Sequence, residues 1–220
     1  SLVNPALLRR CKPEAEIHDS ARLDLNEVLG ILIPAAKAGK RVVRLHTGDP
    51  SVYGAHREQM DALQAAGVPY AVCPGVSSFF GAAASLGAEY TLPGVSQTVI
   101  LTRAAGRTPV PEKERLSALA AHGASMVLFL SAGRVAEAVS ELLAGGYYTN
   151  ETPAAVVYKA TWPDERILRT TLDELAKDAE AAGITKTALL LIGDFLGAAY
   201  ENSKLYDPSF TTEFREGKQA

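Results

Sequence analysis

Apolar residues recur at intervals of three and four from Leu25 to Ala38, which predicts an amphipathic helix over that stretch. Asp24 is a suitable N-cap for this helix, and Gly39 is a suitable stop. After Gly39, short β-branched runs alternate with helical patterns. The predicted elements of the first half are strands at 41–45 and 70–73 and further helices at 51–66 and 77–86.

Glycine and proline residues separate these elements by short loops. Strands that alternate with helices across such loops predict an α/β fold with a parallel, doubly wound sheet in the first half of the chain. Ligands of such sheets bind beyond the carboxyl ends of the strands. The loops at 46–54 and 73–78 follow two of these ends, so both are candidate binding loops.

A new series of elements begins after Pro93 and Gly94. Two of its predicted strands flank a single turn at 162–164, so we expect a mixed sheet in a second α/β domain. The boundary is predicted to separate an N-terminal domain at 1–94 from a C-terminal domain at 95–220. The predicted elements of the second half are strands at 98–102, 126–130, 154–158, 166–170 and 187–192, and helices at 134–143 and 172–182.

Composition narrows the class of protein. The 220 residues are 47% hydrophobic and 21% charged, which is typical of a soluble globular protein of one or two domains. The formal net charge of −3 provides no global positive field that would recruit nucleic acid or anionic lipid. No apolar stretch reaches the ~18 residues of a membrane span, and the N-terminus has no signal-peptide pattern, so we expect a cytoplasmic protein.

Cysteine and histidine residues show no metal-binding or disulfide pattern. Cys11 and Cys73 lie far apart without CxxC spacing, so we expect both to be reduced thiols in the core. The histidines have neither metal-ligand spacing nor the pattern of a serine-hydrolase triad. They are His18, His46, His56 and His122. Metal catalysis is therefore disfavoured.

The sequence TGDPSVYG at 47–54 carries the most distinctive loop of the first half. It has neither the GxxxxGK[ST] spacing of a P-loop nor the GxGxxG spacing of a dinucleotide site. It offers backbone N–H groups, the carboxylate of Asp49 and the ring of Tyr53, which together suit a neutral or zwitterionic ligand with hydroxyls and an amine. The structural alternative is that Asp49 caps the next helix, with Pro50 in its first turn.

A second glycine turn lies in the sequence CPGVSSFFGAAASLG at 73–87. Backbone access near Gly75 suits an adenine or a ribose, and the small residues that follow allow a helix to pack closely. Ser77 is also a possible cap of that helix, in which case its hydroxyl has a structural role.

Cationic side chains gather in the loops of the second half. Lys159 lies near Trp162 after a predicted strand and is a candidate contact for an anion or a π system, unless this is a solvated hairpin tip. A basic loop and the start of a later helix provide charges for a polycarboxylate substrate, unless they form a solvated face. These residues are Arg103, Arg107, Lys113, Arg115 and Arg134.

Four stretches are more specific together than any one is alone. They are TGDPSVYG, PGVSSFFGAAASLGAEYTLPGVSQTVILTRAAGRTPVPE, VVYKATWPDERILRTT and ENSKLYDPSFTTEFR. Together they resemble the precorrin-4 and cobalt-precorrin-4 carbon-11 methyltransferases of the tetrapyrrole methylase family. The first stretch is common to that whole superfamily, which includes diphthine synthases and one class of ribosomal RNA methyltransferases, whereas YKATWPDE and SKLYDPSF are narrower.

The resemblance implies a two-domain tetrapyrrole methylase fold, a homodimer, S-adenosyl-L-methionine as methyl donor and a tetrapyrrole acceptor. The positions that match donor-binding residues of similar enzymes are Thr47, Gly48, Asp49, Val52, Ser77, Ser78, Ser131 and Ala160. A precorrin carries acetate and propionate side chains, so basic residues become candidates for binding it, namely Arg103, Arg107, Arg134 and Lys159. Asp49 and Tyr53 are candidates for a base that removes a proton from the macrocycle.

The implied reaction is methylation of precorrin-4, or of cobalt-precorrin-4, at carbon 11 to give precorrin-5 and S-adenosyl-L-homocysteine. One alternative keeps the superfamily but changes the acceptor to another precorrin, to diphthamide or to ribosomal RNA. Another is a non-catalytic fragment that binds a corrinoid or a nucleotide. Similar enzymes are expected to begin about 25 to 30 residues earlier, with a strand and a GxGPGDPxLLT loop that contacts the donor.

Overall fold

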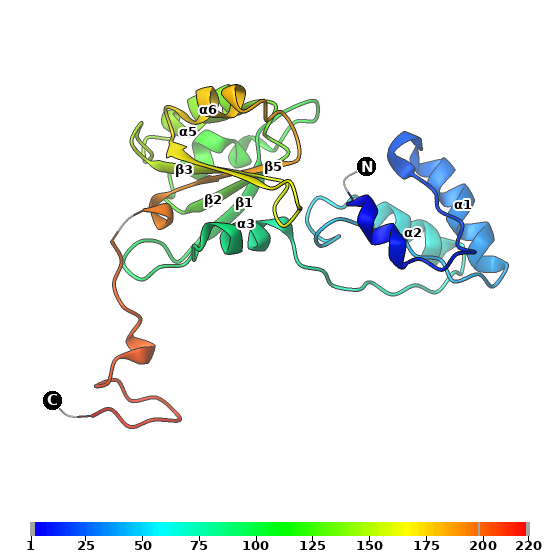
Figure 1. Cartoon of the computed structure of the whole chain (residues 1–220), viewed down its shortest axis with the longest axis horizontal. Helices are drawn as coiled ribbons and strands as arrows, with labels where there is room; N and C mark the ends of the chain where they lie inside the picture. Colours follow the sequence, from blue (N-terminus) through cyan, green and yellow to red (C-terminus); the bar gives the residue numbers. More distant parts are fainter. Residues whose placement is uncertain (1–2, 198, 219–220) are drawn as a thin grey trace. The chain divides into compact units, whose positions relative to one another are not determined.

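The computed structural model describes residues 3–197 and 199–218 (Figure 1). The chain divides into two compact units, Ser1–Phe80 and Gly81–Ala220, and each is described here by itself. The domain boundary predicted between residues 94 and 95 stays a prediction. Among the described residues, every helix is too short or too polar to cross a membrane.

The first unit is built from helices and irregular segments. The predicted helix after Asp24 is confirmed as α1 (Leu25–Lys37). It begins with a capping box, in which the Asp24 carboxylate accepts the Glu27 N–H at 2.9 Å and the Glu27 carboxylate accepts the Asp24 N–H at 2.8 Å. The helices of this unit are η1 (Pro5–Arg10), η2 (Ser20–Arg22), α1, α2 (Arg57–Ala65) and the first turn of α3 (Ser78–Leu86).

The strands predicted at 41–45 and 70–73 do not form in the described part of the chain. Neither segment has regular secondary structure, and neither pairs with another strand there. A strand is stable only when its backbone N–H and carbonyl groups bond to a neighbouring strand. Val43 and Val72 consequently remain 76% and 49% exposed. The parallel sheet predicted for the first half is therefore not built by these residues, although the α/β class of the chain is confirmed.

Two other predictions for this unit need correction. The helix predicted at 51–66 begins only at Arg57, because Tyr53 and Ala55 have φ values of 55° and 46°, which an α-helix excludes. Cys11 and Cys73 are free thiols, as predicted, but both are exposed rather than part of the core. Cys11 follows the short helix η1, which contains no buried residue, and Cys73 lies in the segment at 70–73 that forms no strand.

The second unit contains a five-stranded mixed sheet, which confirms the prediction for this half of the chain. The strand order is β1-β2-β5-β3-β4. Only β1 and β2 are parallel, and the other neighbours are antiparallel. The strands are β1 (Val99–Arg103), β2 (Ser125–Phe129), β3 (Pro153–Tyr158), β4 (Arg166–Thr171) and β5 (Ala188–Ile192). The inner strands β2, β3 and β5 are nearly continuous runs of buried residues, which is typical of strands that are covered on both faces of a sheet.

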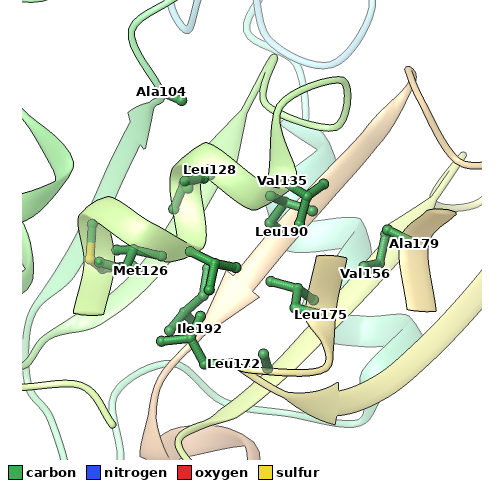
Figure 2. Packing of buried hydrophobic residues seen from close by; sticks show 14 of the residues in the cluster. Ala104, Met126, Leu128, Val135, Val156, Leu172, Leu175, Ala179, Leu190 and Ile192 are labelled. Carbon is green, nitrogen blue, oxygen red and sulfur yellow. The ribbon is translucent and has the colours of Figure 1, made fainter. Parts of the chain in front are cut away.

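Helices cover both faces of this sheet (Figure 1). The helices α5 and α6 lie over one face and α3 lies on the other. Figure 2 shows side chains of β2 and β5, such as Met126, Leu128 and Leu190, packed with Leu175 of α6 in the core, and all four are fully buried. The helical elements after α3 are η3 (Glu112–Glu114), α4 (Leu116–Ala120), α5 (Val135–Ala144), α6 (Leu175–Ala181), η4 (Asp194–Leu196) and η5 (Lys204–Tyr206).

Candidate functional site

The two candidate loops of the first unit meet at Asp49. One oxygen of its carboxylate accepts the backbone N–H of Gly75 at 2.7 Å. The other accepts both the N–H and the hydroxyl of Ser51, at 2.8 and 2.5 Å. These hydrogen bonds lower the pKa of Asp49 to about 2. The hydroxyl of Ser51 contributes most, followed by the N–H groups of Gly75 and Ser51. Asp49 therefore stays ionised at neutral pH and holds the two loops together.

Two glycines allow this close approach. Gly48 has a φ of 62°, and a Cβ at that position would lie 3.3 Å from the Cα of Ser77. A Cβ at Gly75 would overlap the carbonyl oxygen of Gly48. Thr47, Gly48 and Asp49 thus lie against the turn that leads into Ser77 and Ser78. The N–H of Val52 donates to the carbonyl of Asp49 at 3.3 Å, so Val52 belongs to the same loop.

This arrangement brings together six of the positions predicted to bind the donor. They are Thr47, Gly48, Asp49, Val52, Ser77 and Ser78. The helix that Asp49 was suggested to cap begins at Arg57, so the structural alternative for this loop is wrong. Asp49 caps a turn instead, and its second oxygen reaches a loop 26 residues away. The local capping motif and the long-range contact are served by one carboxylate.

The same loop continues into a strained turn and a pair of histidines. Tyr53, a candidate base, has a left-handed backbone and is 46% exposed. The rings of His46 and His56 meet edge to face, with 6.1 Å between their centroids. Burial lowers the pKa of His46 below its ordinary value, and the neighbouring Arg44 and His56 lower it further. Neutral imidazole at His46 is therefore favoured beside the glycine turn.

Ser131 follows β2 in the second unit and is fully buried. Its hydroxyl accepts the N–H of Ala104 at 2.9 Å and donates to the carbonyl of Phe129 at 2.7 Å, so it ties the ends of β1 and β2 together. Because the hydroxyl is used in these two bonds, the predicted contact of Ser131 with a methyl donor would have to come from its backbone. The preceding residue, Leu130, has a φ of 54° and is 68% exposed. Sequence reasoning missed Leu130, because its apolar side chain reads as one more buried position of the strand.

The arginines predicted to bind substrate lie at different places in this unit. The Arg103 guanidinium donates to the carbonyls of Ala104, Thr108 and Pro109 at 3.3, 3.1 and 2.8 Å, and so closes the basic loop. Arg107 lies exposed within that loop. Arg134 precedes α5 and lies 3.5 Å from Glu137. Arg103 thus shapes the loop on which Arg107 is displayed.

Lys159 lies at the start of the loop between β3 and β4. Its Nζ is 2.5 Å from the carboxylate of Asp164 and 5.1 Å from the centroid of the Trp162 ring. The hydrogen bond from the Lys159 ammonium to the Asp164 carboxylate raises the pKa of Lys159 and lowers the pKa of Asp164. The ring of Tyr158 lies 5.2 Å from the same ammonium group. Lys159 lies beside Trp162, and its role as a contact for an anion or a π system stays a prediction. Ala160, the last predicted donor position, follows directly.

Comparison with known proteins identifies the family. The family model described as Tetrapyrrole (Corrin/Porphyrin) Methylases matches residues 2–176. The chain belongs to this family. The cobalt-precorrin-4 C(11)-methyltransferase of Methanocaldococcus jannaschii is 51% identical to it, over 98% of this chain and 83% of that protein. The precorrin-4 C(11)-methyltransferase of Rhodococcus erythropolis is 47% identical, over 94% of this chain and 83% of that protein. The predicted resemblance is confirmed.

Solved structures agree with this membership. A cobalt-precorrin-4 methyltransferase of cobalamin biosynthesis superposes with a TM-score of 0.87 at 47% identity, over 90% of this tetrapyrrole methylase and 82% of that chain. The uroporphyrin-III C-methyltransferase of Thermus thermophilus, solved in complex with S-adenosylhomocysteine, gives a TM-score of 0.66 at 28% identity, over 78% of this chain and 74% of that one. The tetrapyrrole methylase fold is thereby shown.

Proposed function

We propose that this protein transfers a methyl group from S-adenosyl-L-methionine to carbon 11 of precorrin-4 or cobalt-precorrin-4. The products are precorrin-5 or its cobalt form, S-adenosyl-L-homocysteine and a proton. The observation that carries the proposal is the 51% identity to a cobalt-precorrin-4 C(11)-methyltransferase along nearly the whole chain. The likeness to a relative solved with S-adenosylhomocysteine supports the choice of donor.

The residues of the first unit fit a nucleoside of this kind. Gly48 and Gly75 let the two loops pack main chain against main chain, since a Cβ at either position would meet the backbone of the other loop. The loops are fixed before a ligand arrives, because Asp49 bonds to Ser51 and to Gly75. A preorganised site loses less entropy on binding. We assign donor binding here to Thr47, Gly48, Asp49, Val52, Ser77 and Ser78, and in the second unit to Ser131 and Ala160.

The sulfonium of the donor supplies the reactivity of the methyl group. What remains for the protein is to orient the acceptor, and alignment of two reactants can lower a barrier by about 7–11 kcal/mol. We assign the carboxylates of the acceptor to Arg103, Arg107, Arg134 and Lys159, since charge-assisted bonds from these groups match acetate and propionate. Asp49, whose pKa is about 2, is assigned to holding the loops, which leaves Tyr53 as the candidate base.

The proposal extends to a homodimer that acts in the cytoplasm on a small molecule, without a nucleic acid or membrane partner. The resemblance to the family supports the dimer, and the net charge of −3 disfavours nucleic acid. Light scattering of the purified full-length protein tests the dimer directly. A mass equal to one chain at micromolar concentration contradicts it.

The choice of acceptor is tested by competition. The full-length protein is incubated with methyl-labelled S-adenosylmethionine and with precorrin-4, cobalt-precorrin-4, an earlier precorrin, a diphthamide precursor or ribosomal RNA. We expect label only in the precorrin-4 forms, with one S-adenosylhomocysteine formed for each methyl group. Label in the RNA or in the diphthamide precursor would instead support another member of the superfamily. No transfer, together with binding of a corrinoid, would support a non-catalytic role.

A further inference from the structure

The loop that carries Ala160 has an unfavourable backbone conformation. Lys159 and Thr161, on either side of Ala160, have φ values of 49° and 68°. Non-glycine residues adopt this left-handed region at a cost and persist there only when the surrounding structure holds them. Some contact outside the turn must therefore fix the path of the backbone at Ala160.

The carboxylate of Glu165 supplies that contact. Its Oε2 accepts the backbone N–H of Thr161 at 2.5 Å and the hydroxyl of Ser85 at 2.8 Å. Ser85 lies on α3, 80 residues earlier in the chain, so one oxygen joins the loop to the helix. Bonds to an ionised acceptor are stronger than bonds between neutral groups. Glu165 therefore acts as a clamp between α3 and the turn.

The face of α3 is shaped to receive this turn. Gly81 of α3 faces the turn, because a Cβ at this position would be 3.1 Å from the Thr161 methyl and 3.7 Å from the Cβ of Ala160. Further along, the Arg169 guanidinium donates to the carbonyl of Leu86, at the end of α3. The Ala160 turn thus rests on the bare backbone of Gly81 and is tied down at Ser85.

The turn has its own hydrogen bonds apart from the clamp. The N–H of Trp162 donates to the carbonyl of Lys159 at 2.9 Å, and the N–H of Glu165 donates to the carbonyl of Trp162 at 3.1 Å. These backbone bonds do not involve the Glu165 side chain. Loss of the carboxylate is therefore expected to release the turn from α3 without unfolding the β3–β4 hairpin.

We infer that Glu165 is a positioning residue for methyl-donor binding, acting through the backbone of Ala160, and that Ser85 is its partner. This inference rests on the proposed function, which assigns Ala160 to the donor. Glu165 itself touches neither donor nor acceptor in this account. It sets the place of a backbone segment that does.

The test compares Glu165→Ala, Glu165→Gln and Ser85→Ala with Glu180→Ala, a control that removes an exposed glutamate of α6. Calorimetry measures the affinity of the full-length protein for S-adenosylhomocysteine, and NMR measures hydrogen exchange at the Thr161 amide. For Glu165→Ala we expect about tenfold weaker binding and faster exchange, since two bonds to a charged group are lost. The Gln variant retains an acceptor oxygen and should recover much of both, and the control should match the wild type.

Steady-state kinetics separate positioning from general damage. Glu165→Ala should raise the KM for the donor about tenfold, and kcat at saturating donor should change by less than about threefold. If the variant binds S-adenosylhomocysteine as the wild type does, the inference is overturned while the proposed function stands. If the wild type itself does not bind S-adenosylhomocysteine, the proposed function fails and the donor role of Glu165 falls with it.

Discussion

Replacement of Gly75 by alanine tests whether the two loops of the first unit must approach as closely as they do. Gly75 is not one of the glycines with a positive φ, so alanine adds a methyl group without the strain of a left-handed backbone. That methyl group would overlap the carbonyl oxygen of Gly48. Because the obstacle is backbone rather than a flexible side chain, one loop has to move.

The expected size follows from the cost of overpacking, which is about 1–3 kcal/mol for an added methylene group that the surroundings cannot accommodate. Movement of either loop also separates the Gly75 N–H from Asp49, now 2.7 Å apart. If the cost falls on the donor-binding conformation, the dissociation constant for S-adenosylhomocysteine should rise about 5- to 150-fold.

The matched control is Gly30→Ala in α1, where a Cβ would meet nothing within 4 Å. Alanine there is expected to stabilise the helix by about 0.5–1 kcal/mol, with no effect on ligand affinity. Both variants are assayed by calorimetry with S-adenosylhomocysteine and by thermal unfolding. Wild-type affinity in Gly75→Ala would refute the argument that the glycine pair sets the site.

Three further predictions concern packing, pH and the basic loop. Leu190→Ala empties a fully buried position of β5 and should lower the free energy of unfolding by about 2–5 kcal/mol in urea titration; less than about 1 kcal/mol would contradict the assigned core. Burial holds the pKa of His46 below the ordinary value of about 6.5, so the unfolded chain takes up the proton first as pH decreases. The contribution of His46 to the free energy of unfolding should therefore be full above about pH 6.5 and be lost at lower pH. His46→Gln should reduce this loss, and an unchanged pH profile of stability in the variant would contradict the prediction. In Arg103→Lys, the ammonium group cannot replace the planar guanidinium that donates to three loop carbonyls. Hydrogen exchange at the Gly106 amide, which donates to the Thr108 carbonyl, should therefore accelerate. Exchange at the wild-type rate would show that the loop is stable without the Arg103 guanidinium.

Local chemistry explains which elements could be read from the sequence. The start of α1 was predictable because Asp24 is a good N-cap residue. In the structure the carboxylates of Asp24 and Glu27, three residues apart, each accept the backbone N–H of the other. The predictions of the five strands of the second unit were correct because each of these segments finds a pairing partner within that unit. The segments at 41–45 and 70–73 also contain β-branched residues, but they have no pairing partner among the described residues, and β propensity alone does not supply one.

The candidate site also combines features that local sequence reveals with contacts that it does not reveal. The loop motif at 47–54 and the turn at Gly75 were each visible, and the structure adds that one carboxylate joins them. Glu165 and Ser85 gave no signal, because a contact across 80 residues leaves no trace in local spacing. Leu130 was hidden for a different reason, since its exposure depends on a left-handed φ at the end of an ordinary apolar strand.

The proposed reaction places one methyl group on one particular carbon of one particular tetrapyrrole. The most direct measurement is the carbon NMR spectrum of the macrocycle formed by the full-length protein from precorrin-4, or from cobalt-precorrin-4, with ¹³C-methyl S-adenosylmethionine. We expect a single enriched methyl signal, coupled to carbon 11 when that carbon is also labelled. An enriched methyl group at any other carbon, or no enriched signal in the macrocycle, would contradict it.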